Sequence, residues 1–178
     1  MENFKAVIEA LILASEAPLA LEKICAILEE VSKIEVKKAI EELIAEYNER
    51  PGGICLQEVA GGYQFRTRPE LGSWVKKLKM AKPASLSPAA LETLAIVAYR
   101  QPIVKTEIES IRGVDVSGPL KGLLEKKLIR IVGRKDVPGK PIIYGTTRKF
   151  LEVFNLKDLS DLPTLRELKE ISGQQETI

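Results

Sequence analysis

The sequence predicts a mostly α-helical chain with small β hairpins, an α+β fold. Residues 86–147 have the pattern of three short helices followed by a two-stranded hairpin, which is the element order of a winged helix. Residues 1–80 repeat that order at a spacing of roughly 85 residues, as a repeat of architecture rather than of residues. The 178 residues, 45% of them hydrophobic, are enough for two small domains. We therefore predict two tandem winged-helix domains.

Local signals define the first helix of the second half. Ser87 is placed as an N-cap, with Pro88 at the first helical position, where its missing N–H costs nothing. The helix carries an apolar stripe at helical spacing: Leu91, Leu94, Ala95 and Ala98. Further apolar residues lie on its other sides, so we expect it to be buried over most of its circumference. Pro102 ends it.

The rest of the second half predicts a helix-turn-helix and a wing. A short helix containing Ile108 is expected to stop at Gly113, and Ser117 opens a third helix. Ile129–Arg134 and Pro141–Thr146 are rich in β-branched residues and flank a loop, which indicates a hairpin with a long tip. That hairpin would be the wing.

The first half has the same succession of signals. Helices are predicted over Glu2–Ser15 and Leu21–Glu30. Ser32 and Glu35 form a capping box before a third helix, which Pro51 stops.

A hairpin and a closing helix complete the first unit. Strands are predicted over Ile54–Ala60 and Tyr63–Arg68, joined by a turn at Gly61 and Gly62, where both residues can take positive φ. A helix over Glu70–Lys79 is expected to close the unit.

These signals divide the chain into four parts. We expect an N-terminal winged-helix domain over residues 1–80, a linker over 81–85 and a C-terminal winged-helix domain over 86–160. A C-terminal extension, 161–178, is expected to be partly disordered. It contains a possible helix, Thr164–Ile171, with one apolar side that could dock on a partner.

Charge and hydropathy limit the classes of partner that we expect for this chain. Residues 1–80 hold 11 basic and 13 acidic side chains, whereas residues 81–178 hold 16 and 12. Neither half has the strong positive field of a protein whose affinity comes mainly from phosphate contacts. No stretch is apolar enough for a membrane span or a signal peptide, so we expect a cytoplasmic protein with no membrane partner.

The composition excludes most catalytic chemistry. The chain has no histidine, which removes Ser-His and Cys-His nucleophile pairs and imidazole metal sites. Cys25 and Cys55 are expected to be small buried apolar residues rather than a disulfide or a zinc site. Glu42, Glu46 and Glu49 share a helix face, which we interpret as a solvated surface rather than a cation site. We therefore predict no enzymatic activity, no metal and no cofactor.

DNA recognition also lacks its usual side chains. A winged helix that recognises bases needs Arg, Lys, Asn or Gln on its third helix, but the second half offers only Lys121 mid-helix there. The possible DNA contacts are Arg134, Lys135 and Lys140 in the second wing, and the alternative is a solvated basic loop. We expect DNA binding to be weak or indirect at most.

The second half closely resembles the segregation and condensation protein B family, called ScpB. The matching segments are LETLAIVAYRQP at Leu91–Pro102, EIESIRGV at Glu107–Val114 and GRKDVPGKPIIYGTT at Gly133–Thr147. The first half matches mainly by pattern. The resemblance implies a non-enzymatic accessory subunit of the bacterial SMC condensin complex. It implies an N-terminal winged helix that mediates homodimerisation and a C-terminal one that binds the kleisin subunit ScpA, which bridges the SMC ATPase heads.

The resemblance also supplies candidate kleisin-binding residues: Tyr99, Arg100, Gln101, Pro102, Arg112, Arg134 and Tyr144. Large amphipathic side chains at a helix end, such as Tyr99 and Arg100, make efficient interface anchors. The structural alternative for Arg100 is an internal ion pair with Glu107 or Glu109.

The candidate dimerisation residues are Leu56, Tyr63 and Phe65. They put large apolar groups on a hairpin that a small domain can cover only partly. The alternative is that all three pack on their own helices.

The predicted function is a homodimer that clamps an extended kleisin segment and helps to organise and segregate the chromosome on the nucleoid. The alternative is a winged-helix transcriptional regulator, which should bind two DNA half-sites about one helical turn apart.

Overall fold

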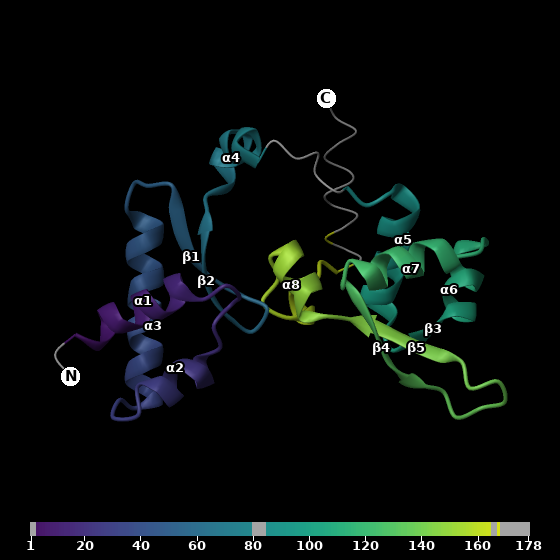
Figure 1. Ribbon diagram of the computed structural model, residues 1–178, viewed down its shortest axis with the longest axis horizontal. Coiled ribbons are helices and arrows are strands. Elements are labelled where there is room, and N and C mark those ends of the chain that lie inside the picture. The colour runs from purple at the N-terminus through teal and green to yellow at the C-terminus, as the bar shows by residue number, and fades with distance from the viewer. Residues whose placement is uncertain (1–2, 80–84, 165–166, 168–178) are drawn as a thin grey trace.

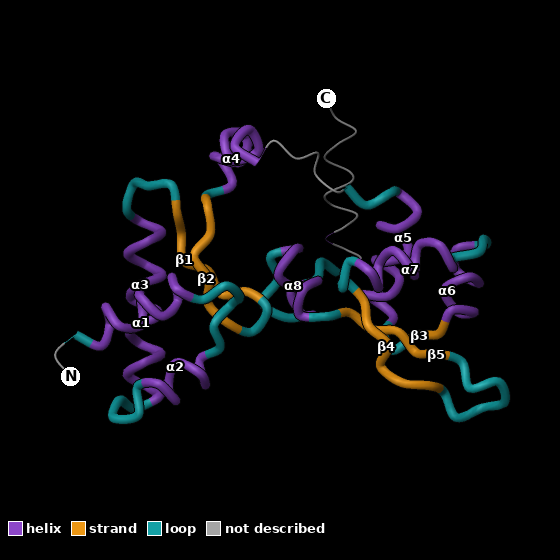
Figure 2. Tube along the Cα trace, in the orientation of Figure 1, coloured by secondary structure: helices purple, strands orange, loops and turns teal. Residues whose placement is uncertain are grey.

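The computed structural model describes residues 3–79, 85–164 and 167. Two separate hydrophobic cores organise them, one in each half of the chain. The structure is mixed α/β, with helices and two small antiparallel sheets (Figures 1 and 2). Residues 81–84 of the predicted linker and most of the predicted helix Thr164–Ile171 lie outside the described residues.

The first half consists of three helices, a hairpin, a short 3₁₀ turn and a fourth helix. Their bounds are α1 Phe4–Ala14, α2 Leu21–Ile27, α3 Lys33–Glu49, β1 Ile54–Val59, β2 Gly62–Thr67, η1 Pro69–Leu71 and α4 Gly72–Lys79. The first core gathers buried residues of α1, α2, α3 and the hairpin, including Ile8, Ile40 and Leu56, each 0% exposed.

Local capping begins α3 where the sequence predicts it. The hydroxyl of Ser32 accepts the backbone N–H of Glu35 at 3.3 Å, and the carboxylate of Glu35 accepts the N–H of Ser32 at 3.1 Å. The hydrogen bond from the Ser32 hydroxyl and then that from its backbone N–H hold the pKa of Glu35 below its ordinary value. The predicted capping box is confirmed.

The turn of the first hairpin lies one residue earlier than predicted. Ala60 (φ 51°) and Gly61 (φ 67°) take the left-handed conformation, and Gly62 is the first residue of β2, opposite Val59. A Cβ added to Gly62 would lie 2.8 Å from the backbone carbon of Leu19. The two glycines therefore have different roles. Gly61 takes the positive φ of the turn, and Gly62 has no side chain that would prevent the close approach of the Leu19 backbone.

The second half adds a three-stranded sheet to its helices. Its bounds are α5 Pro88–Arg100, β3 Ile103–Val104, α6 Lys105–Arg112, α7 Ser117–Glu125, β4 Ile129–Arg134, β5 Ile142–Thr146, α8 Arg148–Phe154 and η2 Leu159–Asp161. The strand order is β3-β5-β4, with Tyr144 of the central strand opposite Ile103 and Ile131. The strand β3 was not predicted, because two residues are too few to show alternation.

The helix α5 begins as predicted but buries a different face. The hydroxyl of Ser87 accepts the N–H of Ala90 at 3.2 Å, which confirms the N-cap. The buried residues are Thr93, Leu94, Val97 and Ala98. Leu91 is 45% exposed, so the expectation that α5 is buried over most of its circumference is wrong.

The two halves meet where the first hairpin turn reaches the end of α8. The backbone N–H groups of Ala60 and Gly61 donate to the carbonyl oxygens of Leu156 (2.8 Å) and Lys157 (2.9 Å). A guanidinium nitrogen of Arg66 in β2 donates to the carbonyl of Glu152 at 2.8 Å. Figure 2 shows α8 between the strand pairs of the two halves.

Candidate partner-binding surface

An apolar groove runs between α5 and α8. It has a volume of about 210 Å³ and is lined by Leu91, Leu94, Ala95, Ala98, Tyr99, Phe150, Phe154 and Leu162. Its two sides are set by local structure. Thr147 caps α8 by accepting the N–H of Phe150 at 3.1 Å, and the rings of Phe150 and Phe154 lie one turn apart with centroids 4.9 Å apart.

Tyr99 stands at the rim of this groove. Its hydroxyl donates to the carbonyl oxygen of Pro163 at 2.7 Å, and the residue is 43% exposed. The ring therefore has one face toward the apolar lining and a polar end fixed on the chain after η2. A half-exposed aromatic ring of this kind is typical of a protein-binding anchor.

Arg100 is the last residue of α5 and Pro102 follows the helix, and both residues are exposed. The internal ion pair considered for Arg100 does not form with either acid. Glu107 pairs instead with Lys135 at 3.1 Å, and Glu109 pairs with Lys105 at 3.2 Å. Arg100 is exposed, and no acid among the residues that the structure describes forms an ion pair with it.

Gln101 and Tyr144 hold the second half together. The side-chain oxygen of Gln101 accepts the N–H of Thr146 at 2.7 Å, and its amide nitrogen donates to the carbonyl of Ala98 at 3.2 Å. Tyr144 is 8% exposed in the central strand. Both side chains are used inside the fold, so neither presents a free surface to a partner.

Arg112 is likewise used inside the fold. Its guanidinium donates to the carbonyl of Ala89 at 2.8 Å and to the hydroxyl of Thr93 at 3.1 Å, and it pairs with Glu92 at 2.9 Å. Its side chain is only 15% exposed. These contacts attach α6 to the first turns of α5.

The basic residues of the second wing are partly engaged within the hairpin. Arg134 donates to the carbonyl of Lys140 at 3.1 Å, and Lys135 forms its ion pair with Glu107. Arg134, Lys135 and Lys140 are all exposed. The pairing with Glu107 reduces the positive charge available to phosphate.

The three candidate dimerisation residues belong to the first core. Leu56 is 0% exposed and Tyr63 8% exposed, and Phe65 packs against the cluster with its ring edge-on to Tyr47, the centroids 4.7 Å apart. This is the alternative arrangement, in which the residues pack on their own helices. The side chain of Leu56 is not available to a second copy.

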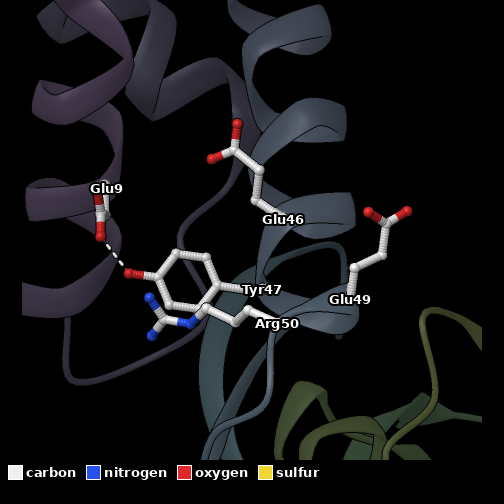
Figure 3. Close-up of a pocket in the computed structure, with 5 residues that line it drawn as sticks. All are labelled: Glu9, Glu46, Tyr47, Glu49 and Arg50. Atoms are coloured by element: carbon white, nitrogen blue, oxygen red, sulfur yellow. Dashed lines mark hydrogen bonds between the residues drawn. The ribbon is translucent and has the colours of Figure 1, made fainter.

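A second hollow, of about 540 Å³, lies between α1 and α3 (Figure 3). The hydroxyl of Tyr47 donates to the carboxylate of Glu9, and this hydrogen bond raises the pKa of Tyr47. Arg50 stacks on the Tyr47 ring with its guanidinium carbon 3.9 Å from the centroid. Glu46 and Glu49 line the hollow, with their carboxylates directed away from the ring. The contacts here tie α1 to α3.

No group of three or more Asp, Glu or Cys within 3–79 and 85–164 is arranged to hold a metal ion. Both cysteines are free thiols, Cys55 buried and Cys25 half-buried, so no disulfide links them. Over the same residues, no helix combines the length and apolarity that a bilayer crossing requires.

Phe150 and Phe154 were missed as site residues, and Leu91 was assigned to the core. The sequence does contain a pattern that could have indicated the two phenylalanines. The Phe150–Phe154 pair is spaced by four residues, as an apolar helix face requires, and it follows directly on the second wing.

The geometry thus defines a mixed α/β protein of helices and small sheets, with an apolar groove between α5 and α8 whose lining could receive a protein segment. Its relatives identify the family. Residues 6–165 match the family model described as "Segregation and condensation complex subunit ScpB", and the chain belongs to that family.

The chain is also similar to individual proteins. The chain is 49% identical to the segregation and condensation protein B of Syntrophotalea carbinolica, over 99% of this chain and 89% of that protein. Among solved structures, ScpB from Mycobacterium tuberculosis is 33% identical, covers 87% of this chain and 96% of its own, and has a TM-score of 0.41. A structure titled as a dimer of the ScpB N-terminal domain complexed with ScpA peptide is 38% identical, covers 43% of this chain and 95% of its own, and has a TM-score of 0.40.

Proposed function

We propose that this chain is a non-enzymatic accessory subunit of an SMC condensin complex, which acts as a homodimer and binds an extended segment of the kleisin subunit ScpA. The proposal rests on the family assignment and on one observation of the site. Tyr99 is part of the lining of an apolar groove that the described residues leave open between α5 and α8. The complex would reach the SMC ATPase through the kleisin, in the cytoplasm and on the nucleoid.

Two winged-helix domains, over residues 1–80 and 86–160, would carry this function. Two separate cores and the repeated order of three helices and a hairpin support this division. The first domain would form the homodimer, and the second would bind the kleisin.

The groove fits an apolar side chain of the kleisin segment. Its lining is almost entirely apolar. On α8, Phe154 of the lining is 41% exposed and Val153, which precedes it, is 54% exposed. Arg100 at the end of α5 is exposed and has no ion pair within the described part of the chain, so its charge could pair with an acidic residue next to the apolar anchor. Of the seven candidate residues, Tyr99, Arg100 and Pro102 therefore remain the strongest for kleisin contact, and Arg134 would contribute only from the wing.

The test is binding of a central ScpA fragment to the full chain by titration calorimetry. We expect Tyr99→Ala and Phe154→Ser to weaken binding by at least about tenfold, because anchors at an interface centre contribute most of its energy. Ile111→Ala is the matched control, since Ile111 is 54% exposed on α6 and lies outside the groove. Unchanged affinity in folded Tyr99→Ala and Phe154→Ser variants would contradict the assignment of the groove.

Binding measurements on the same protein, with operator DNA and with the ScpA fragment, distinguish the proposal from the alternative of a DNA-binding transcriptional regulator. A regulator would bind operator DNA with nanomolar affinity and show no complex with the ScpA fragment at micromolar concentration. These two results together would contradict the proposed function and support the DNA-binding regulator instead.

A further inference from the structure

The short helix α8 is used on two opposite sides. Phe150 and Phe154 line the apolar groove that α8 forms with α5. Arg148 instead reaches the tip of the first hairpin, where its guanidinium donates to the carbonyl oxygen of Ala60 at 3.1 Å. With about 3.6 residues per turn, the two phenylalanines lie about 200° and 240° around the helix from Arg148. One helix therefore connects the groove with the contact between the two halves of the chain (Figure 1).

The contact with the hairpin is concentrated at the C-terminal end of α8. The carbonyl oxygen of Glu152 accepts from the guanidinium of Arg66 at 2.8 Å. Just after the helix, Leu156 and Lys157 accept from the backbone N–H groups of the hairpin turn at 2.8 and 2.9 Å. These hydrogen bonds and those of Arg148 make up the inter-half contact. Phe154 lies between the acceptors in the sequence and is 41% exposed, so its position depends on the backbone that carries it.

The helix α8 is too short to hold its position alone. It has seven residues, fewer than an isolated helix needs in water, so its position depends on what packs against it. Phe150, which is 3% exposed, anchors its first turn in the second core. The inter-half contact holds the other end. The wall of the groove that Phe154 provides is therefore set in part by the first half of the chain.

The inter-half contact is polar, and a hollow of about 330 Å³ lies beside it between the halves. Hydrogen bonds of this kind replace hydrogen bonds to water, so their net contribution to the free energy is small. Small polar contacts between parts of a chain allow relative motion. We therefore expect a closed arrangement in exchange with an open one. Most of the lining of the hollow is polar, and it comes from both halves: Asn48, Gln57 and Glu58 of the first, and Asn155, Lys157 and Asp161 of the second.

We propose that the tip of the first hairpin supports α8 from behind and holds Phe154 where a partner in the groove requires it, so that Arg66 and Arg148 are positioning residues for the groove. This inference rests on the proposed binding of a kleisin segment there. Partner binding and the inter-half contact are then coupled, and the coupling is reciprocal. The closed contact favours binding, and a bound partner keeps the contact closed.

The first experiment measures the affinity of the full chain for the central ScpA fragment by titration calorimetry. Arg66→Ala/Arg148→Ala should weaken binding by at least about threefold, because the apparent affinity falls with the fraction of chains in the closed arrangement. Lys126→Ala/Lys149→Ala is the matched control, since it removes two positive charges from exposed positions outside the groove, and it should bind as the wild type does. Arg66→Lys/Arg148→Lys should recover at least half of the loss, because each acceptor is a single carbonyl oxygen.

The second experiment tests reciprocity on the wild type, so it does not depend on how a variant folds. Hydrogen exchange of the Ala60 and Gly61 amides is followed by NMR with and without saturating ScpA fragment. Both amides lie across α8 from the groove, and we expect the fragment to slow their exchange by at least about threefold. The amide of Val31, which donates to Leu28 within the first half, is the control and should not change.

A direct contact of the fragment with the hairpin turn would give a different pair of results. It would protect the Ala60 and Gly61 amides, yet Arg66→Ala/Arg148→Ala would bind with wild-type affinity. That pair would overturn the coupling.

The two proposals fail in different ways. If the wild type binds the fragment but Arg66→Ala/Arg148→Ala binds equally well, or if exchange at Ala60 and Gly61 does not change, the coupling is overturned and the proposed function stands. If the wild type does not bind the fragment at micromolar concentration, the proposed function is overturned and this inference with it.

Discussion

The guanidinium of Arg148 in α8 donates to the carbonyl oxygen of Ala60, through Nε at 3.3 Å and Nη2 at 3.1 Å. The two residues are 88 positions apart and belong to different halves of the chain. Together with the N–H groups of Ala60 and Gly61, which donate to Leu156 and Lys157, this contact fixes the first hairpin turn to the second half.

Arg148→Ala should loosen that connection. We expect amide exchange at Ala60 and Gly61 to become about fivefold faster, because the lost hydrogen bond contributes about 1 kcal/mol. Hydrogen exchange followed by NMR measures this directly. Lys149→Ala is the control, since among the described residues Lys149 forms an ion pair with Glu152 of its own helix, at 3.0 Å, and with no other acid. Equal exchange in the two variants would show that Arg148 does not hold the turn.

Gly62→Ala should destabilise the first half strongly. The added Cβ would lie 2.8 Å from backbone atoms of Leu19 and of Pro18, which are held by the Leu19–Tyr63 backbone hydrogen bonds and cannot withdraw. We expect a loss of about 2–3 kcal/mol in the free energy of unfolding, measured with urea. Gly61→Ala should lose only about 1 kcal/mol, because its added Cβ has room and only the φ of 67° opposes it. The reverse order of the two variants would contradict this account.

Arg112→Lys should be destabilising although it keeps the charge. One ammonium cannot reach the carbonyl of Ala89, the hydroxyl of Thr93 and the carboxylate of Glu92 together, as the guanidinium does. We expect a loss of about 2 kcal/mol by urea unfolding. Arg100→Lys, at an exposed position, should stay within about 0.5 kcal/mol of the wild type. ScpA affinity unchanged in the folded fraction of Arg112→Lys would separate this structural role from partner contact.

Asp115 should make stability sensitive to acid. Hydrogen bonds from the Ser117 hydroxyl and from Lys105 lower the pKa of Asp115 from 3.8 to about 2. A carboxyl whose pKa is lower in the folded chain stabilises it fully above about pH 4, and that stabilisation is lost as the pH falls through about 2. The Tm of Asp115→Asn should therefore lie below that of the wild type at pH 6, with the difference shrinking between pH 4 and pH 2. A difference independent of pH in thermal unfolding would refute this role.

Local chemistry was enough to predict most elements from the sequence. Ser32 and Ser87 cap their helices through their own side chains, and Gly113 ends α6 at a φ of 71°, so these boundaries depend on residues next to them. The strand Ile129–Arg134 has the predicted bounds, because half of its residues are β-branched.

The candidate site was predictable only in part, because the uses of its residues depend on distant segments. Sequence alone could not show that Gln101 would be bound to Thr146, or Arg112 to Ala89, since both partners come from other elements. The apolar stripe of α5 was recognised, but α8 and the groove it forms with Leu91 depend on how the chain returns after the second wing.

Dependence on a distant segment also explains why the turn of the first hairpin was predicted one residue too late. Two adjacent glycines predict a tight turn, and only the approach of Leu19 decides which of them occupies it.

The tip of the first hairpin is covered by the other half of its own chain. Ala60 is 3% exposed, its N–H and carbonyl are both engaged, and α8 stands over the turn. In a groove-binding module the corresponding tip would project freely and insert alongside a sugar-phosphate strand. A duplex approaching this chain would find that position already filled by protein, and would have to separate α8 from the hairpin before touching it.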